Sequence, residues 1–251
     1  MQYTINGTTM PVLSIDLEAG EAIIAEPGEF SWMTTNIALN TTTQTAGARG
    51  LFSILGRALA GGGLFMTEYR AIDGEGVVAF AAKVPGSIHA VDLAPGQPIL
   101  IHKHGFLCAT EGVQLAIAFQ QRLGTGLFGG NGFILQKVTG PGTAFVELGG
   151  ETVLYDLEPG QALMAHPGHI GMFEESVSFE IQFIRGLKNA LFGGDGLFMA
   201  RLTGPGKIWL QSLTVPNLAH AIEPYIVRDT NSSAASGGIA GAIVDGLLRD
   251  R

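Results

Sequence analysis

The sequence has little cysteine, few basic residues and no long apolar run. Its single cysteine, Cys108, excludes a disulfide-stabilised scaffold. Lysine and arginine number 14 against 22 acidic residues, and the net charge of −8 argues against a duplex-binding protein, which needs a basic surface. No stretch reaches the roughly 18 apolar residues of a membrane span, and no secretory signal precedes the first motif. We therefore expect a cytoplasmic protein that binds no nucleic acid.

Apolar residues and glycine are abundant instead. Hydrophobic residues make up 46% of the 251 positions, and 37 are glycine, which is about twice the usual share. This composition indicates a folded chain with many turns rather than a disordered one. Cys108 lies within an apolar run, residues 105–109, so we expect a buried, inert thiol.

Three copies of one pattern run along the chain. The first phrase has the pattern Asp-Leu-x-x-Gly-Glu/Gln and occurs at residues 16–21, 92–97 and 156–161. An apolar stretch follows it each time. A second phrase, Gly-x-Gly followed by an apolar stretch, occurs at residues 74–76, 140–142 and 204–206. A glycine-rich stretch lies between the two phrases in each copy. This is the signature of an internal repeat.

The pattern within each copy is typical of strands. Residues 177–183 alternate apolar and polar side chains, and no helix alternates with the strands. Each copy is too small to bury a good core alone, so we expect the three to share one. The prediction is an all-β fold of three antiparallel units, stacked as a sandwich with pseudo-threefold symmetry. It places one compact body at residues 1–228, with repeats at about 10–85, 86–149 and 150–213.

Several motifs resemble one known family. Residues 24–33 (IAEPGEFSWM), residues 191–196 (LFGGDG) and residues 202–211 (LTGPGKIWLQ) are similar to the altered-inheritance-of-mitochondria family. The resemblance covers roughly residues 10 to 212. It implies a fold like that of the tryptophan RNA-binding attenuator protein and, in mitochondrial relatives, a role in inner-membrane organisation. It supplies no catalytic residue.

Equivalent positions in the three repeats suggest a metal site. Glu26, His102 and His166 each lie ten residues after the aspartate that opens the first phrase. If these positions face a common axis, two histidines and a carboxylate would suit Fe(II), Mn(II) or Zn(II). His104 and His169 are reserve ligands. The alternative is that all three are ordinary turn residues, and no cofactor other than a divalent transition metal is expected.

Residues 124–129 match the Gly-x-Gly-x-x-Gly pattern of dinucleotide-binding loops. Such a loop needs a strand before it, a helix after it and an acidic residue further on. The aligned stretch of the third repeat, residues 186–193, loses the pattern. We therefore interpret the match as a by-product of the repeat.

Apolar residues of the variable stretches and the tail form a predicted interaction surface. Its members are Leu51, Phe52, Leu55, Leu127, Phe128, Leu191, Phe192, Ile239, Ile243 and Leu247. They either tuck into the core or form a rim that contacts another subunit or a lipid surface. The last three lie in residues 229–251, which read as a flexible linker followed by a short helix that needs a docking partner.

The leading hypothesis is a non-enzymatic oligomeric scaffold or interaction protein, with a homo-oligomeric, protein or membrane-surface partner. Strands with open edges favour assembly, because an edge must be covered. The alternative is a small-molecule or metal-binding module at Glu26, His102 and His166, followed by a cupin-like metal enzyme. RNA binding ranks last, because the basic residues are scattered.

Overall fold

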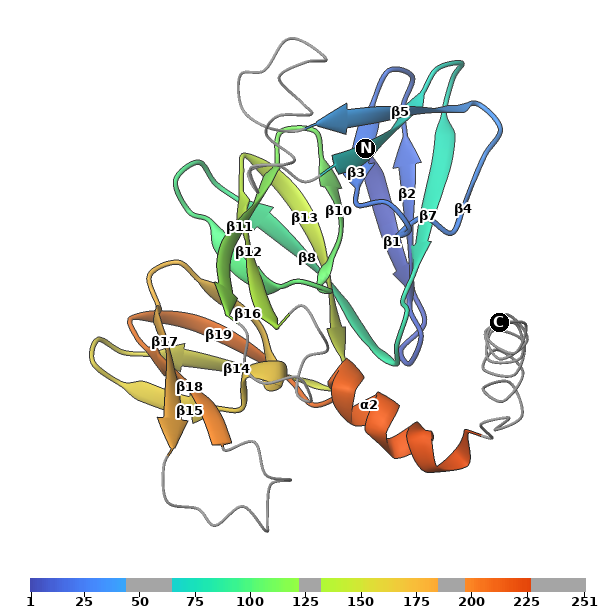
Figure 1. The fold of residues 1–251 in the computed structure, drawn as a ribbon. Helices are drawn as coiled ribbons and strands as arrows, with labels where there is room; N and C mark the ends of the chain where they lie inside the picture. The colour runs from blue at the N-terminus through green and yellow to red at the C-terminus, as the bar shows by residue number, and fades with distance from the viewer. Residues whose placement is uncertain (44–64, 122–131, 185–196, 227–251) are drawn as a thin grey trace, which may run out of the picture. The chain divides into compact units, whose positions relative to one another are not determined.

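In the computed structural model, the chain is built almost entirely of antiparallel strands (Figure 1). The structure describes residues 1–43, 65–121, 132–184 and 197–226. The expectation of an all-β fold is confirmed. Residues Met1–Pro216 form one compact unit that contains every described strand, and Asn217–Arg251 form a second unit. The predicted linker and helix at 229–251 lie outside the described residues.

The strands of the first half of the chain form two sheets. Sheet A has the order β1-β2-β7-β4, and sheet B has the order β5-β6-β3-β10-β13-β8. The bounds in sheet A are β1 (Gln2–Asn6), β2 (Val12–Leu17), β7 (Gly76–Ala81) and β4 (Trp32–Met33). Those in sheet B are β5 (Ile37–Thr43), β6 (Phe65–Ala71), β3 (Ala22–Ala25), β10 (Phe106–Thr110), β13 (Gly142–Gly149) and β8 (Gly86–Leu93).

The remaining strands form two further sheets. Sheet C has the order β11-β12-β9-β16-β19-β14, and sheet D has the order β15-β18-β17. The bounds in sheet C are β11 (Gln114–Gln121), β12 (Phe133–Thr139), β9 (Ile99–His102), β16 (Ile170–Glu174), β19 (Gly206–Gln211) and β14 (Thr152–Leu157). Those in sheet D are β15 (Ala162–Ala165), β18 (Leu197–Thr203) and β17 (Ser178–Ile184). The described helices are η2 (Pro167–His169), α2 (Val215–Ile222) and η3 (Glu223–Tyr225).

Each repeat divides its six strands between two successive sheets. Repeat 1 places β2, β7 and β4 in sheet A and β3, β6 and β5 in sheet B. Repeat 2 places β8, β13 and β10 in sheet B and β9, β12 and β11 in sheet C. Repeat 3 places β14, β19 and β16 in sheet C and the remaining three in sheet D. Neighbouring repeats therefore share a six-stranded sheet, and sheets A and D hold only half of that pattern.

The first phrase of each repeat forms a tight turn between two strands. The N–H of Glu21 donates to the carbonyl of Glu18, and the N–H of Gln161 donates to that of Glu158 in the same way. The third turn residue is Gly20 in repeat 1 and Gly160 in repeat 3, with φ of 87° and 83°. A type II turn requires positive φ at this place, which explains why the phrase keeps its glycine.

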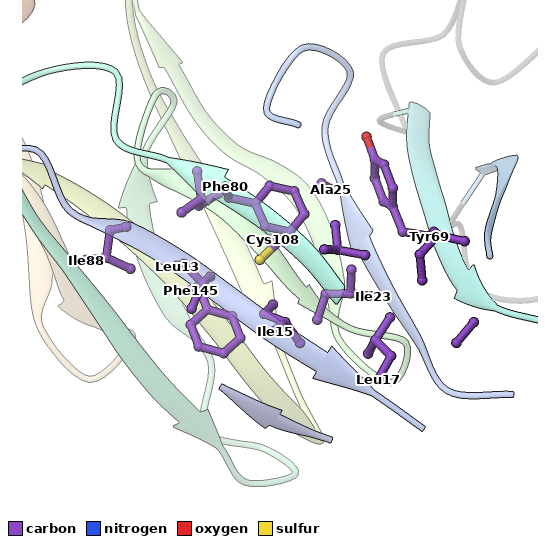
Figure 2. Packing of buried hydrophobic residues seen from close by; sticks show 14 residues of the cluster. Leu13, Ile15, Leu17, Ile23, Ala25, Tyr69, Phe80, Ile88, Cys108 and Phe145 are labelled. Carbon is purple, nitrogen blue, oxygen red and sulfur yellow. The ribbon is translucent and has the colours of Figure 1, made fainter. Parts of the chain in front are cut away.

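Three apolar clusters fill the spaces between successive sheets, in place of the single shared core that was expected. The first cluster combines Leu13 and Phe80 of sheet A with Cys108 and Phe145 of sheet B (Figure 2). Cys108 is buried, as its apolar surroundings predicted, and burial raises the pKa of its thiol. Its neighbour Ala109 belongs to the second cluster, between sheets B and C. Because successive side chains of a strand point to opposite faces, a shared sheet supplies two cores.

The pseudo-threefold arrangement is not confirmed. To close the three repeats on themselves, β15 of sheet D would have to pair with β4 of sheet A, as β3 pairs with β10. Among the described residues β15 pairs with β18 and β4 pairs with β7, and neither has a partner on its other edge. The repeats follow one another in series, each pair of neighbours joined by a shared sheet.

Candidate functional sites at the repeat junction and the sheet edges

The three residues predicted to bind a metal all lie at the end of equivalent strands. Glu26 follows β3, His102 ends β9, and His166 follows β15 and caps η2. These strands belong to sheets B, C and D respectively. The equivalence read from the sequence thus places the three side chains in three different sheets.

Glu26 links repeat 1 to repeat 2. Its Oε1 accepts a hydrogen bond from Nε2 of Gln136 on β12, at 2.6 Å. Burial raises the pKa of the Glu26 carboxyl, while the hydrogen bond from Gln136 lowers it. Glu29 nearby forms an ion pair with Lys83, whose Nζ lies 2.6 Å from Oε2. Polar partners therefore hold two acidic residues of repeat 1 near the first junction, which is the boundary between repeats 1 and 2.

His102 packs against Gly105. A Cβ added at Gly105 would lie 2.9 Å from Nε2 of His102, so the imidazole occupies the space that a larger residue would need. Burial, and then the charge of His104, lower the pKa of His102 to about 4, although a hydrogen bond with the backbone of Glu147 acts to raise it. The buried Nε2 has no hydrogen-bond partner among the described residues. The ring is therefore held neutral at physiological pH.

His166 has different surroundings. Its ring centroid lies 5.9 Å from that of His169, and its Nδ1 accepts from the N–H of Gly168 at 3.3 Å. Nδ1 of His169 bonds the carbonyl of Gln211 at 2.8 Å. Burial, and then the charge of His169, lower the pKa of His166. His169 occupies the repeat position of Gly105, so the third repeat has a histidine ring where the second has none.

The described residues contain no group of three or more His, Cys, Asp or Glu side chains placed to hold a metal ion. Glu26, His102 and His166 each have partners of their own, and so does the reserve ligand His169. The three-ligand metal site therefore gains no support from the arrangement and stays a prediction. Of the three, Glu26 joins neighbouring repeats, through its hydrogen bond with Gln136.

Sequence reasoning missed a buried carboxylate at this junction. Glu147 is 3% exposed, and its Oε1 accepts from the N–H groups of Lys83 and Val84 at 2.7 and 3.1 Å. Its Oε2 and the Oε1 of Gln136 are buried and have no partner among the described residues. The signal was present in the alignment of the repeats, because Ala81, Glu147 and Gln211 occupy one strand position and only one of them is charged.

Sheets A and D expose strands whose equivalents are buried. Met164 on β15 is 41% exposed, whereas Ile24, at the same position of β3, is 1% exposed. Trp32 on β4 is 53% exposed, whereas its equivalents Cys108 and Met172 are 0% and 1% exposed. The difference arises because β3 and β9 are covered by the next repeat, and β10 and β16 by the preceding one. The exposed edge strands β4 of sheet A and β15 of sheet D are therefore the second candidate site.

A further apolar run is exposed on β14, at the border of sheet C. Val153, Leu154 and Tyr155 are successive residues and all are exposed. In repeat 1 the equivalent strand β2 is bordered by β1, and its Leu13 and Ile15 are buried. The ten apolar residues predicted from the sequence to form an interaction surface lie outside the described residues. The exposed strands were not among the sequence-based candidates.

Within the described part of the chain, none of the helices has the length and apolar character that crossing a bilayer requires.

Comparison with known proteins supports the resemblance read from the sequence. An uncharacterised protein of Streptococcus pyogenes serotype M6 is 28% identical over 236 residues, which cover 92% of this chain and 93% of that protein. A crystal structure of a Streptococcus pyogenes protein has a similar fold, with a TM-score of 0.71 and 24% identity over 90% of this chain and 99% of that one. The sequence pattern of the family described as Mitochondrial biogenesis AIM24 matches residues 3–213. The chain therefore belongs to the AIM24 family.

Proposed function

We propose that this protein is a non-enzymatic scaffold that works as a homo-oligomer in the cytoplasm. One observation carries the proposal: the first and last sheets are half-sheets with exposed, apolar edge strands. Large exposed apolar side chains at an unpaired strand edge favour pairing with another chain, because backbone groups and apolar surface are then covered together. Trp32 and Met164 are such side chains.

The polar junction supports a structural role for the interior. Glu26 with Gln136, and Glu147 with the backbone of Lys83, connect repeat 1 to repeat 2. Contacts of this kind fix how neighbouring repeats are joined, as in other repeat proteins, where each unit is stabilised mainly by its neighbours. A protein or membrane-surface partner would then meet an assembled array rather than a single chain.

The experiment is the absolute mass of purified, untagged protein, measured by light scattering over a range of concentrations. We expect a mass that is a multiple of 26.3 kDa and that rises with concentration. Trp32→Lys should lower this mass, because a charge on an edge strand opposes pairing. Met10→Lys is the matched control, since Met10 is also a large, apolar and exposed residue but lies in the turn between β1 and β2. A monomer of 26.3 kDa at all concentrations would refute the proposal.

A further inference from the structure

The two internal junctions between repeats use one register. At the first, Ala109 of β10 lies opposite Ile24 of β3. At the second, Phe173 of β16 lies opposite Leu100 of β9. Ala109 and Phe173 each lie 17 positions after the aspartate that opens the first phrase of their own repeat. Ile24 and Leu100 each lie 8 positions after the same aspartate of the preceding repeat. The junction is therefore a repeated, well-defined structural element.

The chain carries one unused copy of each half of this junction. Strand β15 is the equivalent of β3 and β9, and its outer edge has no partner among the described residues. Strand β4 is the equivalent of β10 and β16, and its outer edge is equally free within the described ranges. The existing pairing of β4 with β7 already follows the shared register, because Trp32 lies opposite Ala79 as Cys108 lies opposite Phe145.

We propose that β15 of one chain pairs with β4 of a second copy, so that a half-sheet D and a half-sheet A join into a sheet like B and C. This inference rests on the proposed oligomeric function and names its interface. The register of the internal junctions places Met33 opposite Met164. Exposed Trp32 and Met164 become covered, as Cys108 and Ile24 are inside the chain.

The two surfaces that meet are different, so the contact is heterologous. A heterologous contact that repeats from copy to copy generates a closed ring or an open filament. The new junction lacks one hydrogen bond of the internal ones, because Ala81 occupies the position of Glu147 and Gln211 and cannot accept from a neighbouring backbone. We therefore expect it to be weaker than the internal junctions and to depend on protein concentration.

Disulfide trapping tests the register. Opposed residues of antiparallel strands have Cα atoms about 4.5–5.5 Å apart, which suits a disulfide. Chains carrying Met33→Cys and chains carrying Met164→Cys, co-expressed and oxidised, should form a cross-linked pair that neither variant forms alone. Met33→Cys with Phe183→Cys is the control, because Phe183 is exposed on β17, at the opposite edge of sheet D. The native Cys108 is buried and does not compete.

The outcomes separate this inference from the proposed function. An assembled wild-type protein with no Met33–Met164 cross-link would overturn the interface while leaving the oligomer standing. If Leu154→Lys then dissociated the assembly and Met164→Lys did not, the exposed strand β14 would be the contact instead. A chain carrying both Cys substitutions that cross-linked only within itself would also overturn the pairing between copies. Dissociation by Met164→Lys, with Phe183→Lys leaving the mass unchanged, would support it.

Discussion

Glu147 and Gln211 occupy the same position in neighbouring repeats, and each binds the end of the repeat before it. Oε1 of Glu147 accepts from the N–H of Lys83 at 2.7 Å, and Oε1 of Gln211 accepts from the N–H of Gly149 at 2.9 Å. The two side chains differ in their other terminal atom, which is Nε2 in Gln211 and Oε2 in Glu147. Nε2 of Gln211 donates to the carbonyl of Gly168 at 3.0 Å, whereas Oε2 of Glu147 has no partner among the described residues.

This difference predicts how substitutions at Glu147 behave. Glu147→Gln keeps the acceptor and adds a donor, so we expect the free energy of unfolding to stay the same or to rise by up to about 1 kcal/mol. Glu147→Ala removes the acceptor of two backbone N–H groups and should lower that free energy by about 1–3 kcal/mol. Urea unfolding measures both. Equal destabilisation by the two substitutions would show that the acceptor is not what matters.

We predict that position 105 must be glycine because the ring of His102 leaves no space for a Cβ there. Gly105→Ala places a Cβ 2.9 Å from Nε2 of His102 and 3.2 Å from its carbonyl oxygen, and overpacking of this kind costs about 1–3 kcal/mol. Removing the ring with His102→Ala should reduce the cost of Gly105→Ala, because the closest contact is gone. A double-mutant cycle, followed by thermal unfolding, measures this coupling. Additive effects of the two substitutions would argue against it.

Acid should destabilise the protein through His102. Its pKa is lowered to about 4 in the folded chain, below the ordinary value of about 6.5, so the unfolded chain binds more protons between these two values. The stabilisation is complete above pH 6.5 and is lost as the pH falls towards 4. We expect a loss of about 1–3 kcal/mol, reduced by solvent screening because the residue as a whole is only half-buried, although its Nε2 is buried.

His102→Gln isolates this contribution. Stability of the variant, measured by urea unfolding from pH 4 to 7, should depend less on pH than that of the wild type. His220→Gln is the control, because His220 is exposed in α2. Some dependence will remain, because burial also lowers the pKa values of His89 and His166. The raised pKa of Glu26 acts with the opposite sign, since its contribution is lost as the pH rises. An unchanged pH dependence in His102→Gln would contradict the assignment.

The metal prediction has a direct measurement. Because Glu26, His102 and His166 contact different partners, we expect purified protein to hold less than one metal ion per chain. Added Zn²⁺ should leave the melting temperature unchanged. Elemental analysis of the wild type and of the His102→Ala, His166→Ala double variant provides the comparison. One metal ion per wild-type chain that disappears in the double variant would establish the site.

The sequence alone was sufficient for the strand content and the repeats. Turn glycines such as Gly20 and Gly160 recur because one backbone conformation requires them, and the apolar stretches between them alternate or run continuously as strands do. These features depend on residues close together in the chain. The same local character allowed Glu26, His102 and His166 to be recognised as equivalent strand ends.

The tertiary structure alone decided what each equivalent position contacts. Met164 and Ile24 lie in the same phrase of their repeats, yet one is exposed and the other buried, because a following repeat covers only Ile24. His102 meets Gly105, whereas His166 meets His169, and Glu26 meets Gln136 from another repeat. A repeated sequence specifies the same strand each time, but the surroundings of that strand depend on which repeat packs beside it. For the first and last sheets, no such neighbouring repeat is present among the described residues of the chain.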